Sequence, residues 1–123
     1  MDHGFTLLEL LVVLTIVSVL TAISVPQYNS YKQRAFDTRA LSDLHNAAIA
    51  EEAYFMDNEE YLACSNAACT SLPGFAALSA GVELSITADD EGFQAQASHP
   101  KGTGKIFLWD SREGGFIGEG GLG

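Results

Sequence analysis

The sequence predicts an α+β protein in which a long N-terminal helix is followed by a small antiparallel sheet. Two changes of pattern support this fold class. The first half of the chain carries an apolar run and then a helical stripe, whereas the second half alternates apolar and polar residues with the period of a strand. The length of 123 residues suits one domain, with fewer than about 100 residues left for a globular part after an apolar N-terminal segment.

The apolar run extends from Phe5 to Val25 and contains a single charged residue, Glu9. It is about 21 residues long, so a helix of this length spans about 31 Å, which matches the hydrocarbon core of a bilayer. A secretory signal peptide is the alternative, but such peptides have a basic start, a shorter apolar stretch and a small-residue cleavage site. The run therefore predicts a membrane-spanning helix.

Pro26 follows the apolar run and predicts a kink or a local loosening of the helix. Proline lacks a backbone N–H, and its ring clashes with the preceding turn. Beyond this residue the helical pattern resumes and stops near Asp57. The sequence therefore predicts one helix from about Phe5 to Asp57.

The second half of this helix has an apolar stripe that we expect to pack on the sheet. Glu51 falls within the stripe as an exception. Asp37 and Asp43 are expected on the opposite, exposed face, beside basic neighbours. The stripe consists of Ala40, Leu41, Leu44, Ala47, Ala48, Tyr54 and Phe55.

The period changes from helix to strand after a connecting region at residues 58–81. Turn residues, rich in glycine and aspartate, separate the alternating segments. A meander of three or four strands packed on the helix stripe is the economical architecture. The predicted strands are residues 82–87, 93–98 and 106–110, with a short fourth at 116–117.

Composition and motifs argue against several classes of function. The formal net charge of −10 opposes broad attraction to nucleic acid. No nucleophile motif, phosphate-binding loop or metal-ligand spacing is apparent, so we expect no enzyme activity, no cofactor and no metal. Asp89, Asp90 and Glu91 leave a calcium site open as an alternative to a solvated turn, which we favour.

The segment Gly4-Phe5-Thr6-Leu7-Leu8-Glu9-Leu10 places a carboxylate inside the membrane-length apolar run. An ionised acid in such a run is unfavourable unless something compensates it. With Pro26, Tyr28 and Tyr31 after the run, this segment resembles the type IV pilin family, which includes the pseudopilins. The first 31 residues carry most of the resemblance.

The resemblance implies that residues 1–4 are a leader peptide, removed by a prepilin peptidase between Gly4 and Phe5, and that Phe5 is then N-methylated. Glu9 resembles the acid that pairs with the N-terminal amine of a neighbouring subunit, so Phe5, Glu9 and Pro26 are the expected assembly residues. Since an unpaired amine and an unpaired carboxylate are each unfavourable in an apolar bundle, the pair would fix the subunit's register. Unlike the leaders of this family, residues 1–4 contain no Lys or Arg, which leaves an upstream start open.

By the same resemblance, residues 5–27 would be a transmembrane and filament-core helix and residues 28–123 a globular pilin domain with its αβ-loop at 58–81 and its sheet at 82–118. The implied function is a pilus subunit supporting adhesion, twitching motility or DNA uptake. Its partners would be copies of itself, inner-membrane lipid, the prepilin peptidase and the pilus assembly machinery. The precursor would lie in the inner membrane with a periplasmic C-terminal domain, and the assembled subunit would be extracellular. A type II secretion pseudopilin and a monomeric membrane-anchored binding domain remain alternatives.

Cys64 and Cys69 are the only cysteines and lie in a polar loop. Export of the globular part to an oxidising compartment would favour a disulfide between them. Closure of so short a loop would stabilise the protein by about 2–3 kcal/mol at most. Free thiols and a metal site are the alternatives.

Overall fold

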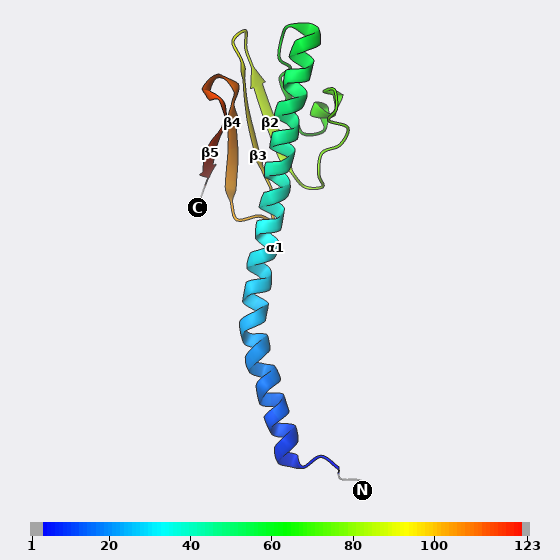
Figure 1. The fold of residues 1–123 in the computed structure, drawn as a ribbon, viewed down its shortest axis with the longest axis vertical. Helices are drawn as coiled ribbons and strands as arrows, with labels where there is room; N and C mark the ends of the chain where they lie inside the picture. Colours follow the sequence, from blue (N-terminus) through cyan, green and yellow to red (C-terminus); the bar gives the residue numbers. More distant parts are fainter. Residues whose placement is uncertain (1–3, 122–123) are drawn as a thin grey trace. The chain divides into compact units, whose positions relative to one another are not determined.

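The computed structural model describes residues 4–121. Residues 1–3 of the predicted leader lie outside this range. One helix, α1 (Leu7–Asn58), precedes the sheet (Figure 1). The chain divides into two compact units, Met1–Lys32 and Gln33–Gly123.

The first unit consists mainly of the first half of α1. Thr6 caps the helix, because its hydroxyl oxygen accepts a hydrogen bond from the backbone N–H of Glu9 at 3.1 Å. The hydroxyl groups of Thr15 and Ser18 donate to helix carbonyls four residues earlier, which satisfies them within the apolar segment. The helix continues through Pro26 without a break, so the kink or local loosening predicted at this residue does not end the helix.

The second unit combines the rest of α1 with an antiparallel sheet in which each strand pairs with its neighbour in sequence. This arrangement confirms the predicted α+β class and the meander. Two short 3₁₀-helices lie beside the strands, η1 (Asn66–Ser71) and η2 (Ser111–Glu113). The strands are β1 (Cys64–Ser65), β2 (Glu83–Ala88), β3 (Phe93–Ser98), β4 (Lys105–Asp110) and β5 (Gly115–Gly121).

The sheet has five strands, whereas the sequence predicts three or four. The additional strand β1 lies within the predicted connection and pairs Cys64 with Ile86. It has two residues, too few to show alternation. β5 extends beyond the predicted end of the sheet at residue 118, and alternation does not reveal its full length because glycine occupies Gly115, Gly118, Gly120 and Gly121.

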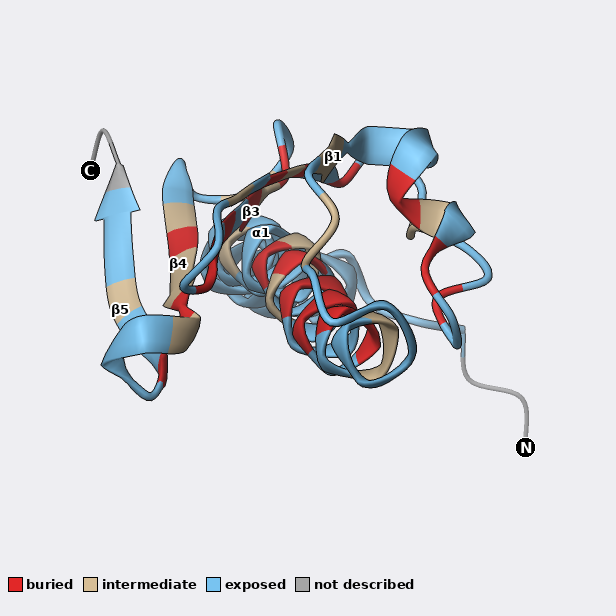
Figure 2. Ribbon diagram, turned by 90° about the horizontal axis from the view of Figure 1, so that it is seen from above, coloured by how far each residue is buried: buried red, intermediate tan, exposed pale blue. Residues whose placement is uncertain are grey.

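The core lies between the helix stripe and one face of the sheet, where buried positions of α1 and the strands gather (Figure 2). Ala40, Leu44, Ala47 and Ala48 are buried as predicted. Phe55 departs from the prediction, with 37% of its surface exposed. The strands contribute Leu84, Ile86, Phe93, Ala95, Ala97 and Phe107.

Asp37 and Asp43 are buried, so the prediction that they lie on an exposed face is wrong. The Asp37 carboxylate accepts hydrogen bonds from the backbone N–H of Thr103 at 3.1 Å and from its hydroxyl at 2.6 Å. Asp43 accepts from the N–H of Ser79 at 2.8 Å and from its hydroxyl at 3.0 Å. Each carboxylate thus joins α1 to a loop, and a Cβ atom at Gly102 would overlap the Asp37 carboxylate. The partners are 66 and 36 residues away, a separation that helical spacing cannot reveal.

Candidate assembly site

The first half of α1 presents an apolar surface. Large side chains between Leu7 and Val25 are half exposed or more, as in Leu14 at 54% and Leu20 at 58%. By length and composition this helix is able to cross a membrane. Transfer of such a surface from water to an apolar environment is favourable by about 25 cal/mol per Å². The segment is therefore suited to lipid or to neighbouring apolar helices.

Gly4 and Phe5 precede the helix, in a part of the chain without regular structure. Both are exposed, and Phe5 has 86% of its surface accessible. The peptide bond between them is therefore open to a peptidase in this single chain. Cleavage there and methylation of Phe5 remain predictions.

Glu9 lies in the first turn of α1, close in sequence to Phe5, and is exposed. The positive end of the helix dipole favours a carboxylate at this position. Within residues 4–121 of one chain, Glu9 forms no ion pair. Pairing of Glu9 with the amine of a neighbouring subunit remains a prediction. Pro26 is also exposed.

A disulfide joins Cys64 and Cys69, as predicted for an exported domain. Cys64 belongs to β1 and pairs with Ile86 of β2, whereas Cys69 lies fully buried in η1. The bond therefore ties the connection between helix and sheet to the core.

Reduction of the Cys64–Cys69 bond is expected to loosen this connection without unfolding the sheet. The enclosed loop is short, so the entropic contribution of the bond is about 2 kcal/mol. Reduction should increase the rate of amide hydrogen exchange more in η1 than in β3. A cooperative loss of protection in all strands would contradict this expectation. Equal masses of untreated and reduced exported protein would show that the bond does not form.

Glu51 is a buried carboxyl group whose setting the sequence does not anticipate. One oxygen, Oε1, accepts a hydrogen bond from the backbone N–H of Leu62 at 3.0 Å. The other, Oε2, is buried and has no hydrogen-bond partner among residues 4–121. Burial raises the pKa of Glu51 to about 7, opposed by the Leu62 hydrogen bond and assisted by the charge of Glu52. In the sequence, the only sign of this buried carboxyl group is the position of Glu51 within an otherwise apolar helix stripe.

The turn between β2 and β3 is stabilised by bonds within the chain. Asp89 Oδ1 accepts from the backbone N–H groups of Glu91 and Gly92, each at 2.9 Å, and Oδ2 accepts from Arg112 at 3.0 Å. The two backbone hydrogen bonds are the main reason that the pKa of Asp89 lies below its usual value. In the described part of the chain, no group of three or more His, Cys, Asp or Glu side chains is placed to hold a metal ion.

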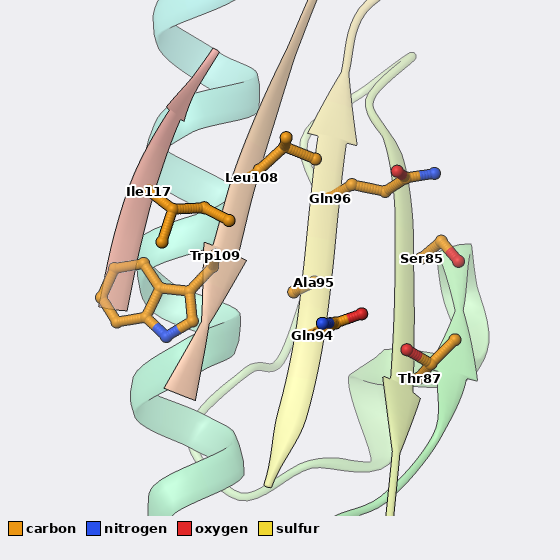
Figure 3. A pocket seen from close by; sticks show the side chains of 8 residues that line it. All are labelled: Ser85, Thr87, Gln94, Ala95, Gln96, Leu108, Trp109 and Ile117. Carbon is orange, nitrogen blue, oxygen red and sulfur yellow. The ribbon is translucent and has the colours of Figure 1, made fainter. Parts of the chain in front are cut away.

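The sheet face that carries Gln94 and Gln96 has a groove of about 330 Å³ (Figure 3). Its polar groups are hydroxyls and amides, and Gln94 donates to Asp110 at 2.9 Å. None of the lining residues is charged, so the groove offers hydrogen bonds and apolar contact. The lining consists of Ser85, Thr87, Gln94, Ala95, Gln96, Leu108, Trp109 and Ile117.

Comparison with known proteins agrees with the character of the N-terminal segment. Residues 1–25 match the family model of the prokaryotic N-terminal methylation motif. The chain is 37% identical over 101 residues to the type IV wide pilus major component PilA4 of Thermus thermophilus, covering 81% of this chain and 76% of that protein. It is 33% identical over 111 residues to the type IV major fimbrial protein FimA of Dichelobacter nodosus, covering 75% and 68%.

A shorter similarity links the chain to a secretion protein. It is 40% identical over 60 residues to the type II secretion system core protein G of Pectobacterium carotovorum subsp. carotovorum, which covers 49% of this chain and 38% of that protein. The similarities to the two pilus proteins extend over most of their length. Together with the exposed apolar helix and the α+β unit, they establish that this chain belongs to the type IV pilin family.

Proposed function

We propose that this chain is the structural subunit of a type IV pilus filament and acts mechanically, without catalysis. The observation that carries this proposal is an exposed apolar helix of membrane length whose first turn bears a carboxylate, joined to a folded α+β unit. Such a helix can exchange lipid for the helices of neighbouring copies. PilA4 and FimA are named as major components of pili or fimbriae, which agrees with a polymerising role.

In the proposed mechanism, prepilin peptidase cuts between Gly4 and Phe5, and the new N-terminus is methylated. The amine of Phe5 then pairs with Glu9 of a neighbouring copy inside the helical bundle. Each of these charged groups is unfavourable in apolar surroundings when it is unpaired. A subunit inserted at the correct depth pairs both charges, whereas a subunit at another depth leaves them unpaired. Methylation keeps the positive charge of the amine and adds apolar surface.

Before assembly, the precursor lies in the inner membrane through residues 5–27, with residues 28–123 in the periplasm. The disulfide fits this location, because oxidising compartments favour such bonds. After assembly, the subunit is part of an extracellular filament that supports adhesion, twitching motility or DNA uptake.

Intact mass of assembled filaments tests the processing step. We expect a chain that begins with monomethylated Phe5 and lacks residues 1–4. Replacement of Gly4 by a bulkier residue should block cleavage, because a peptidase must approach the backbone closely at the cut. Replacement of the exposed Gly120, which lies in β5 far along the chain, is the matched control and should leave cleavage unchanged. Uncleaved precursor in assembled filaments would refute the processing step.

A pseudopilin of a type II secretion system is the second candidate, favoured by the similarity to core protein G. Electron microscopy of the native cells separates the two functions. Long surface filaments containing this chain support the pilus subunit. A secretion defect on deletion, with no surface filaments lost, supports the pseudopilin.

A further inference from the structure

The second unit carries negative charge at one end. There the end of α1 lies near the β2–β3 turn (Figure 1). The Tyr61 ring stacks on Phe55 at 4.7 Å between ring centroids, and its centroid lies 4.9 Å from that of Phe93 at the start of β3. Exposed carboxylates gather on these two segments. We define the acidic end as Asp57, Glu59, Glu60, Asp90 and Glu91.

The opposite end of the same unit carries positive charge. There the β3–β4 loop packs on α1, because His99 stacks on Phe36 at 4.4 Å between ring centroids. We define the basic end as the exposed residues Arg39 and Lys101, whose cationic groups lie 5.3 and 5.9 Å from the Phe36 ring centroid. Arg34 adds positive charge just before them in sequence.

The charges that define the two ends are not neutralised within the chain. Across residues 4–121, the ion pairs involve Lys105 with Glu119 and Arg112 with Asp89 and Asp110, but none of the residues that define either end. Glu83 is a further exposed carboxylate near the basic side, at the start of β2. The unit is therefore electrically polar along the direction of its strands.

We propose that neighbouring copies of this chain stack with the basic end of one second unit on the acidic end of the next. This inference rests on the proposed function as a polymerising subunit. Like ends repel, which disfavours a closed two-fold dimer through either end, whereas opposite ends attract. A contact between two different surfaces repeats without closing on itself and so builds a filament.

Two charge-reversed variants of the full chain test this contact in cells that carry a type IV pilus assembly system but lack their own pilin. One variant combines Arg39→Glu with Lys101→Glu. The other combines Asp57→Lys, Glu59→Lys and Glu60→Lys, which turns the net charge of the acidic end from negative to positive. Each alone should give roughly tenfold fewer filaments, a change that corresponds to only about 1.4 kcal/mol at a subunit junction. Co-expression should restore filaments in which the two variants alternate, because the reversed basic end of one variant meets the reversed acidic end of the other, and the two unreversed ends still match.

Both variants keep a negative net charge, so overall attraction between oppositely charged proteins cannot explain recovery. The charge-conserving variants are the matched controls and should polymerise normally: Arg39→Lys with Lys101→Arg, and Asp57→Glu with Glu59→Asp and Glu60→Asp. Membrane levels of each precursor and Trp109 fluorescence check folding. Normal filament numbers from either reversed variant alone, or no recovery on co-expression, would overturn the stacking contact. Absence of filaments from the unaltered chain would instead refute the proposed function.

Discussion

Glu9→Ala is expected to abolish filaments or make them scarce while leaving the membrane precursor stable and cleaved. The substitution removes a charge from an apolar segment, so insertion of the precursor should be at least as favourable as before. In the filament, the amine of Phe5 would be buried without its partner. Loss of one member of a buried ion pair typically costs about 3–5 kcal/mol. Filament counts by electron microscopy and precursor levels by immunoblot measure the two effects separately.

The conservative change Glu9→Asp separates the effect of side-chain length from the effect of charge. It keeps the charge but shortens the side chain, so we expect a partial defect. Thr6 should still cap the helix in both variants, because the cap accepts from the backbone N–H of residue 9. Filaments of normal number and length from Glu9→Ala would exclude the charge-pairing mechanism. They would also favour a membrane anchor in which Glu9 merely interacts with the helix dipole.

Glu51→Gln is expected to stabilise the second unit at pH 8 and to have little effect at pH 4. The pKa of Glu51 is raised from 4.5 to about 7 by burial, so the folded state holds this proton more tightly than the unfolded chain. The stability contributed by the protonated carboxyl is complete below about pH 4.5 and is lost as the pH rises through about 7. The full difference corresponds to about 3 kcal/mol. Glutamine remains neutral throughout and should avoid this loss.

Guanidinium unfolding of the detergent-solubilised full chain measures this effect. Trp109 is the only tryptophan, and its ring lies 5.2 Å from that of His45 on α1, so its fluorescence reports on helix–sheet packing. The difference in unfolding free energy between variant and parent should grow from pH 4 to pH 8. Glu83→Gln removes an exposed carboxylate that does not act on Glu51 and should lack this growth. A pH-independent difference for Glu51→Gln would contradict the raised pKa.

Most of the observed fold could be predicted from the local periodicity of apolar residues in the sequence. The helix is expected from about Phe5 to Asp57 and extends from Leu7 to Asn58. The strands β2 and β3 lie where alternation places them, because each has one buried face. β4 also lies at its predicted place, although burial does not alternate along it. The two cysteines predict the disulfide, since few alternatives exist for a single pair.

The missed features depend on partners that are distant in sequence. The pattern assigns Asp37 and Asp43 to a solvated helix face, but loops folded back from residues 79 and 103 bury both carboxylates. Glu51 is recognisable as an exception, yet its burial becomes evident only when Leu62 is placed beside it. For the assembly residues, the predicted pair joins Phe5 of one copy to Glu9 of another, so the structure of a single chain does not contain the contact. Their roles therefore depend on the experiments with Gly4 and Glu9.

The order of the strands has a consequence for how the second unit folds. Because β2, β3, β4 and β5 each pair with the next strand in sequence, their hairpins close only short loops, and such local closure favours rapid folding. The contacts of Asp43 and Asp37 close much longer loops, with partners 36 and 66 residues away. We therefore expect the meander to form first and the second half of α1 to dock on it afterwards. Substitutions at Asp37 should then mainly accelerate unfolding and leave the folding rate nearly unchanged.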